Sequence, residues 1–473
     1  MSDPSIGELP TSNGDDPRLI DARPTKDFFV SMLVRDVDLL DAVIDLIDNS
    51  VDGARRLRPP GDGPWTGLRV VVETTENRFQ ISDNCGGISL DTARDYAFRF
   101  GRDPSRAVDA GSIGQFGVGM KRTLFKLGRH FAVNSKTEDQ SFTLDQDVDE
   151  WRESPLWEFV LADVDLSTRR SKDETGTSIE VDKLHRPVAD DLSNANWTNR
   201  LRTEVRLKHR LALNRGLTIE VNGQQLEPLP LELIETDDIR PGHRVEQFAS
   251  GVEVDLLAGV GESDPTSAGW YVFCNDRLVV GPDRTELTVW EGRGRTARGG
   301  GVRYHDQFAR FRGYARLSAD ESSLLPWTTT KTGVDVDHPV WRRTRQLMLE
   351  LTRPVIDFLN DLDRERTYVA GDARAGQPGL SDDESIELAI VGEQLEVGTK
   401  VSFDRAVGAE TFLRPSVALA KLPARQAWLR FRAATSDIQR ARVAMGGNTE
   451  RDLPNADVGR QSFEYYLRNE ADD

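Results

Sequence analysis

The stretch from Leu39 to Ala54, LLDAVIDLIDNSVDGA, carries the residues best suited to chemistry. Its apolar residues recur at alternating steps of four and three, which predicts an amphipathic helix with one face in a core. At 100° per residue, a second flank of this helix carries Asp41, Asp45, Asp48, Asn49 and Asp52. Like charges four residues apart destabilise a helix, so we expect a positive group over this flank. The alternative is a solvated acidic face on a chain of net charge −18.

A glycine-rich segment, IGQFGVGMK from Ile113 to Lys121, directly precedes the helical stretch KRTLFKLG. Glycines in this position let backbone N–H groups approach phosphate oxygens, and the helix N-terminus favours negative charge. The alternative is a flexible loop that caps a helix. The spacing GxxGxG, with no GKS or GKT after it, disfavours both the dinucleotide fingerprint and the P-loop.

The elements around these segments predict an α+β fold. Two strands, LRVVVET from Leu68 and RFQIS from Arg78, form a hairpin that runs into the turn DNCGG at residues 83–87, and Ser89 then caps a helix. The helices come early and the strands follow with hairpin-like spacing, which favours a layered α/β sandwich over a parallel nucleotide-binding sheet. The later strands are expected at residues 130–135, 142–145, 157–161, 177–181 and 217–221.

Length and composition indicate a multidomain protein without a membrane segment. The 473 residues suffice for two or three domains, and no run of eighteen apolar residues exists. Because the first twenty residues lack the features of a signal peptide, we expect a cytoplasmic location and no membrane contact. The two cysteines, Cys85 and Cys274, form neither a disulfide framework nor a metal cluster.

Composition shifts divide the chain into five parts. We expect a disordered arm at 1–21, a first domain at 22–230, a second α/β domain at 231–366, a linker at 367–385 and a C-terminal extension at 386–473. The second domain ends in a long helix from residue 338 to about residue 366. The extension is small and mainly helical, with helices at residues 436–445 and 457–467 on either side of a Gly-Gly break.

Taken together, four segments resemble the boxes of the GHKL (Bergerat-fold) ATPases, a family that includes DNA gyrase B subunits, a heat-shock chaperone, histidine kinases, MutL and the MORC proteins. These segments are the acidic helix with Asp45 and Asn49, the turn at 83–87, the GxxGxG loop and Gly176-Thr177. The resemblance spans residues 28–181. It implies a Bergerat-type α/β sandwich that binds ATP and magnesium.

The resemblance also implies a role for each matching residue. Asp45 would activate the attacking water, and Asn49 would hold magnesium, which would supply the positive charge missing from the acidic flank. Asp83 would accept the adenine amino group, Gly87 would let the base approach the backbone, and Thr177 would support that contact. The phosphates would be held by the loop residues Gly114, Gly117, Val118, Gly119 and Lys121.

Two positions depart from the family pattern. The family base is usually Glu, and Asp45 is one methylene shorter, which predicts slow hydrolysis. Cys85 stands where the first glycine of the turn usually lies, while Gly87 keeps the position nearest the base.

The second domain resembles the transducer domain of MutL-like and MORC-like proteins. Lys331, in WTTTKTGVD, matches the lysine that meets the γ-phosphate there, and YVFCNDRLV from Tyr271 resembles a transducer strand with its Asn-x-Arg. The alternative for Lys331 is a surface lysine in a threonine-rich turn. Since the ATP domain comes first and no histidine lies in a phosphoacceptor-like helix ahead of it, a sensor kinase is disfavoured.

The function implied is that of a slow, magnesium-dependent ATPase of the MORC or MutL-like branch. A lid at residues 101–119 would close over ATP, the chain would form an ATP-dependent homodimer, and it would act on DNA or other nucleic acid in a DNA-transaction or defence role, with or without a partner protein. A basic segment, Arg293–Arg316, has seven arginines and one acid, and would contact phosphates or pair with an acidic surface. A chaperone-like protein remodeller and a nucleotide-sensing module with little hydrolysis are the alternatives.

Overall fold

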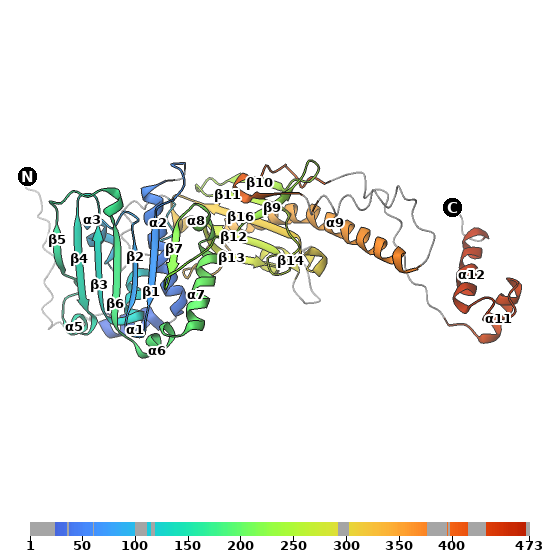
Figure 1. Cartoon of the computed structure of the whole chain (residues 1–473), viewed down its shortest axis with the longest axis horizontal. Helices are drawn as coiled ribbons and strands as arrows, with labels where there is room; N and C mark the ends of the chain where they lie inside the picture. Colours follow the sequence, from blue (N-terminus) through green and yellow to red (C-terminus); the bar gives the residue numbers. More distant parts are fainter. Residues whose placement is uncertain are drawn as a thin grey trace, which may run out of the picture. The chain divides into compact units, whose positions relative to one another are not determined.

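The structure is a computed structural model that describes residues 24–35, 37–59, 61–99, 111–114, 119–291, 302–375, 395, 398–414 and 432–469. The chain forms two compact units, Met1–Ala420 and Lys421–Asp473, which we describe separately (Figure 1). None of the helices in the described ranges combines the length and the apolar content that a membrane span requires.

The first unit begins with an eight-stranded sheet, called here the large sheet, in the order β5-β4-β3-β6-β2-β1-β7-β8. Neighbouring strands are antiparallel except for the parallel pair β1 and β7 (Figure 1). This mixed sheet with its helices is the α+β sandwich that the sequence predicted. The strands are β1 Arg69–Thr74, β2 Phe79–Asp83, β3 Gly128–Lys136, β4 Ser141–Asp147, β5 Leu161–Asp165, β6 Gly176–Leu184, β7 Thr218–Val221 and β8 Gln224–Gln225.

Eight helices and one π-helical turn accompany the large sheet in the described part of the chain. Ser89 accepts a hydrogen bond from the backbone of Thr92 and so caps α3, as predicted. The helices are α1 Lys26–Arg35, α2 Leu39–Leu57, α3 Leu90–Thr92, the π-helical turn Ala93–Ala97, α4 Gly119–Leu127, α5 Val148–Glu153, α6 Arg186–Leu192, α7 Ala195–Lys208 and α8 Arg210–Asn214.

The helix α2 is the central element of the first half of this unit, which is the half built on the large sheet. Asp38 caps its N-terminus by accepting from the backbone of Leu40, and the helix ends just before Pro59. The predicted apolar stripe is buried in the core beneath the sheet. The acidic flank is buried too, because Asp45, Asp48 and Asp52 are covered by other elements of the first unit. The helix is therefore enclosed on both sides.

The strand predicted at 157–161 begins later, since β5 spans Leu161–Asp165. Residues before it are used in packing. Trp157 lies edge-on to Trp151 and to Phe29 of α1, and Lys26 donates to the carbonyl of Leu156 at 2.6 Å. These contacts fasten the segment to α1 and α5, so it cannot pair with β4.

The first unit continues with a five-stranded sheet, called here the small sheet, in the order β10-β11-β16-β12-β13. Only β12 and β16 are parallel, and Trp270 on β12 lies opposite Gly313 on β16, where a Cβ atom would come within 2.4 Å of the indole ring. The indole N–H donates to Thr352 of α9 at 3.1 Å, which joins helix and sheet. The bounds are β10 Gly242–Gln247, β11 Glu253–Val260, β12 Gly269–Cys274, β13 Arg277–Asp283, β16 Phe311–Ser318 and α9 Pro339–Ala375.

Short elements complete the first unit, and one of them changes the expected boundary of the C-terminal extension. Residues 398–414 pack against the second half of the unit, since β17 pairs with β9 and the Phe412 ring contacts Phe358 of α9 at 5.4 Å. The short strands are β9 Glu232–Glu235, β14 Trp290–Glu291, β15 Val302–Arg303 and β17 Thr399–Ser402. The 3₁₀ turns are Lys172–Glu174, Glu286–Thr288, Asp306–Phe308, Ser322–Leu324 and Phe403–Arg405.

The second unit contains the helices α11, Thr435–Ala444, and α12, Asn455–Asn469, close to the predicted ranges. Gly446, at φ +86°, and Gly447 separate them. Arg442 holds the hairpin together because its buried side chain donates to the carbonyl of Leu453 at 2.9 Å.

Candidate functional site

The acidic flank of α2 is neutralised by cations of the chain itself. Lys208 donates to Asp41 at 2.6 Å, Arg122 to Asp45 at 2.7 Å, and Arg277 to Asp48 at 2.8 Å. The expectation that magnesium supplies the missing positive charge is therefore corrected: side chains from α7, α4 and β13 cover the flank. A solvated acidic face is also excluded, since these carboxylates are partly or wholly buried.

Asp45 lies where α4 begins. Its Oδ2 accepts from Arg122, and its Oδ1 accepts from the Lys331 Nζ at 3.1 Å. A Cβ on Gly119, the first residue of α4, would lie 3.4 Å from Oδ2. The structure thus brings together three residues that the sequence singled out separately: the carboxylate, the last glycine of the loop and the lysine of the second half.

Asp48 is the most deeply buried carboxylate of the flank, at 0 % exposure. Its Oδ1 accepts from Arg277, and its Oδ2 accepts from the Lys331 Nζ at 2.8 Å. Burial opposes ionisation, but the charges of Arg277 and Lys331 hold the pKa of Asp48 well below its usual range. Burial also opposes the charge of Lys331, yet Asp48 and Asp45 raise its pKa. These pairs therefore stay charged at neutral pH.

His209 lies on the third side of Asp48, with Nε2 at 3.3 Å from Oδ1. Nε2 forms no hydrogen bond with the described residues. Because burial lowers the pKa of His209 to about 3, the imidazole is neutral at physiological pH. Asp48 is consequently balanced by Arg277 and Lys331, without a charge from His209.

Asp52 anchors the start of the glycine-rich segment. Its two carboxylate oxygens accept from the backbone N–H groups of Ile113 at 2.8 Å and Gly114 at 2.9 Å. Burial raises its pKa, which these two hydrogen bonds counteract. Gly114 is thus placed beside α2, whereas Gly117 and Val118 lie outside the described residues.

Asp83 ends β2 and receives hydrogen bonds from three elements. Oδ1 accepts from the backbone N–H of Cys85 at 2.9 Å and of Thr177 at 3.2 Å, and Oδ2 accepts from the Ser50 hydroxyl at 2.7 Å. Burial raises the pKa of Asp83, against these hydrogen bonds. A carboxylate offers about four acceptor positions. One position on Oδ2 remains for a further donor, such as the amino group of a base.

Two glycines allow the backbone to pack closely beside Asp83. Gly87 has φ +70°, and a Cβ there would lie 2.2 Å from the carbonyl oxygen of Lys136. Gly176 has φ +156°, and a Cβ there would lie 1.9 Å from the carbonyl oxygen of Asp83 itself. Only glycine allows these close approaches, which bring β2, β3 and β6 together around the carboxylate.

Asn49 is an exposed amide on an otherwise buried turn of α2. Within the described ranges, no cluster of three His, Cys, Asp or Glu side chains could hold a metal ion by itself. Magnesium binds proteins through one or two oxygen ligands and takes its others from phosphates and water, and the side-chain oxygen of Asn49 is an atom of that kind.

Lys121 is placed differently from the expectation that it holds phosphates. Its side chain is buried, and Nζ donates to the carbonyl of Ala97 at 2.7 Å. Lys121, the third residue of α4, faces the π-helical turn, and its ammonium group stabilises that turn. Burial lowers the pKa of Lys121 to about 7.

The turn between β12 and β13 joins the small sheet to this site. Asn275 and Asp276 both have positive φ, as a two-residue hairpin turn requires. The Asn275 amide donates to the carbonyl of Ser112 at 3.0 Å, just before Ile113, and Arg55 of α2 pairs with Asp276 at 3.0 Å. The predicted Asn-x-Arg is thus Asn275 and Arg277, and both contact the first half of the chain.

Residues 37–177 match the family model described as histidine kinase-, DNA gyrase B-, and HSP90-like ATPase. The chain carries a GHKL-type ATPase domain. The matched segment begins just before α2 and ends at Thr177, so it contains all four boxes of the site. A domain of this family binds ATP. The comparison with curated proteins gave no match.

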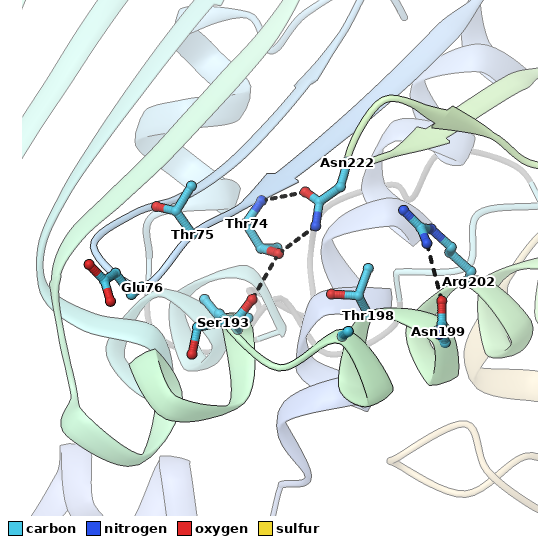
Figure 2. Close-up of a pocket in the computed structure, with 10 residues that line it drawn as sticks. Thr74, Thr75, Glu76, Ser193, Thr198, Asn199, Arg202 and Asn222 are labelled. Carbon is cyan, nitrogen blue, oxygen red and sulfur yellow. Dashed lines mark hydrogen bonds between the residues drawn. The ribbon is translucent and has the colours of Figure 1, made fainter.

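A hollow of about 450 Å³ lies beside the last residue of β1 (Figure 2). Thr74 and Asn222 exchange two hydrogen bonds there, and Arg202 of α7 donates to the carbonyl of Val221 at 3.0 Å. Asp83 pairs with the opposite end of β1. The polar side chains of this hollow hold β1, α7 and the β7–β8 turn together.

Two groups that build the site, Arg122 and Ser50, were not singled out by the sequence, and Asp48 and Asp52 were placed on the acidic flank without a specific role. Arg122 pairs with Asp45, Ser50 donates to Asp83, and Asp52 holds the loop, while Asp48 binds two cations. Asp48, Ser50 and Asp52 belong to the same helix turns as Asn49, so helical periodicity was a signal for them. No short-range pattern marks the partner of Asp48 on β13.

The pKa of Lys121 predicts a pH dependence of stability. The folded domain releases this proton near pH 7, whereas the unfolded chain keeps it until about 10.5, so the unfolded state binds more protons between these values. The free energy of unfolding should therefore rise with pH, by about 2 kcal/mol between about pH 7 and 9. In Lys121→Met this rise should vanish in denaturant titrations. The control Lys126→Met, on the same helix, retains Lys121 and should show the same rise as the wild type. An unchanged rise of the unfolding free energy with pH in Lys121→Met would contradict the low pKa of Lys121.

Proposed function

We propose that the chain is a slow, magnesium-dependent ATPase in which residues 22–230 bind ATP and residues 231–366 act as a transducer. The observation that carries this proposal is that Lys331, from the second half, contacts Asp45, the base candidate of the ATPase domain, at 3.1 Å. A surface lysine in a threonine-rich turn would be exposed, whereas Lys331 is buried.

In this proposal different residues contact different parts of the nucleotide. Asp83 accepts the amino group of the base, Gly87 and Thr177 shape the wall beside it, and the loop from Gly114 to Gly119 faces the phosphates. Magnesium, when bound at Asn49, would neutralise phosphate charge and orient the phosphate oxygens. These assignments rest on the free acceptor of Asp83 and on the exposed amide of Asn49.

Asp45 can take a proton from water only through an oxygen that is free to accept it. Its Oδ2 is engaged by Arg122 and its Oδ1 by Lys331. About two of the four acceptor positions of Asp45 remain for a water molecule, and the two cations compete with that water for the carboxylate. This competition, added to the short side chain, supports slow turnover.

We further propose an action on nucleic acid, of the MORC or MutL-like kind, by an ATP-dependent homodimer whose lid is residues 101–119. Within the basic segment, Arg312 is buried and donates to backbone carbonyls, Arg310 donates to the carbonyl of Gly261 at 3.3 Å, and Arg316 pairs with Asp276 at 2.7 Å, so these three stabilise the fold. Arg303 is exposed, and Arg293, Arg295 and Arg298 lie outside the described residues. The phosphate contacts are therefore assigned to these four arginines.

The base and the nucleotide pocket predict different mutant phenotypes. Asp45→Asn should abolish turnover, because it removes the proton acceptor, and should leave ADP affinity within about twofold, because Asp45 is not assigned a contact with ADP. Asp83→Asn should weaken ATP and ADP alike, by about tenfold or more, because a buried acceptor is lost. Steady-state hydrolysis and calorimetric ADP titrations measure both. Wild-type turnover by Asp45→Asn would show that another group is the base.

Lys331 should act on ATP and not on ADP. Lys331→Ala should lower kcat by about tenfold or more and leave ADP affinity nearly unchanged, since ADP has no γ-phosphate. Arg343→Ala, which removes a half-buried pair with Glu246 in the same half, is the matched control. Equal losses of ATP and ADP affinity in Lys331→Ala would argue against a transducer role.

Salt dependence tests the nucleic-acid proposal. Affinity for a short DNA duplex should fall steeply between about 50 and 200 mM salt, with little sequence preference. Replacement of Arg293, Arg295, Arg298 and Arg303 by Ala should flatten the slope of log K against log salt by about one unit per lost phosphate contact. Fluorescence anisotropy measures both. Absence of binding by the wild type at low salt, with and without ATP, would instead favour a chaperone-like remodeller.

A further inference from the structure

Five charged side chains form a continuous chain of alternating sign through the junction of the two halves. Arg277 contacts Asp48 at 2.8 Å, Asp48 contacts Lys331 at 2.8 Å, Lys331 contacts Asp45 at 3.1 Å, and Asp45 contacts Arg122 at 2.7 Å. We call these residues the charge chain. They come from β13, α2, the loop before α9 and α4, so no single element places them.

The inner end of the charge chain is rigid. The side chains of Arg277 and Asp48 are 2 % and 1 % exposed, and the guanidinium also donates to the carbonyl of Leu278. The adjoining turn is fixed by Asp276, which pairs with Arg55, Arg215 and Arg316. Arg277 therefore presents its charge to Asp48 from a fixed backbone.

The outer end is more open, since the side chains of Arg122 and Asp45 are 15 % and 10 % exposed. The charge chain holds three cations against two carboxylates, so an arriving phosphate meets an excess of positive charge. Lys331 has a positive φ, +55°, which is a backbone conformation that lysine rarely adopts. Its ammonium group is directed by the two carboxylates that it contacts.

We propose that Asp48 is a positioning residue for Lys331: it holds the ammonium group at the Asp45 end of the ATP site, and Arg277 in turn fixes Asp48. This inference rests on the proposed function, in which Lys331 meets the γ-phosphate. Asp48 itself has no opening to substrate, because its two oxygens are enclosed by Arg277, Lys331 and His209. Its effect on turnover must pass through Lys331.

A purely structural role for the Asp48–Arg277 pair is the competing explanation, and a double-mutant cycle separates the two. If Asp48 acts through Lys331, Asp48→Asn should lower kcat about as much as Lys331→Ala, with ADP affinity within about twofold. In the Lys331→Ala background, Asp48→Asn should then change kcat by less than about twofold. Additive losses would overturn the proposal.

Asp41→Asn is the matched control for this cycle. Asp41 lies on the same helix and pairs with Lys208 at 2.6 Å, but it does not touch the charge chain. Its replacement should leave kcat and ADP affinity within about twofold of the wild type. Arg277→Lys is the second variant, for use if Asp48→Asn does not fold. It keeps the charge but loses the forked guanidinium, so it should give a smaller loss of kcat that also disappears in the Lys331→Ala background.

A chemical readout makes the test independent of hydrolysis. Limited acetylation of the full chain with acetic anhydride, mapped by peptide mass, should find Lys331 protected in the wild type and in Asp41→Asn. In Asp48→Asn its rate should rise several-fold relative to Lys26, which is buried against the carbonyls of α5 and reports global unfolding. Unchanged protection of Lys331 in Asp48→Asn would overturn the positioning role. Absence of ATP binding by the wild type would instead overturn the proposed function, and the labelling result would still stand.

Discussion

An ionised carboxylate inside a protein costs several kcal/mol unless cations and hydrogen bonds replace the water that it loses. Asp48, at the centre of α2, is such a group, and its two cations come from β13 and from the loop before α9. The ATPase domain therefore cannot bury its own helix without the second half of the chain. The junction between the halves is a condition of the fold as well as of the site.

The same junction explains why the two sheets form one compact unit. Asp276 gathers arginines from α2, β16 and the residue after α8, and although burial opposes its ionisation, Arg316, Arg55 and Arg215 hold its pKa below the ordinary value. Asn275 binds the carbonyl of Ser112 at the root of the glycine-rich segment. Movement of the small sheet would thus be felt at the loop and at Asp45, and this coupling supports the transducer role that we propose.

Local and long-range chemistry can be separated residue by residue. The apolar stripe of α2, the β1–β2 hairpin and the cap at Ser89 follow from periodicity and turn chemistry, and the structure confirms them. The later start of β5 does not, because the aromatic packing of Trp157 with Phe29 outweighs strand propensity. Likewise, the burial of Lys121 against Ala97 depends on where the π-helical turn lies.

Residue types and their local spacing predict the α+β class, the GHKL-type boxes and an acidic flank that needs positive charge. These are short-range properties, since residue type and spacing along one helix or turn specify them. The charges that cover the flank follow instead from how distant parts of the chain pack together. Arg277 lies 229 residues from Asp48, and Lys331 lies 286 from Asp45, so chain topology alone brings them within hydrogen-bonding distance. Spacing predicted that Asp48 needed a partner, but the folding of the small sheet against α2 selected that partner.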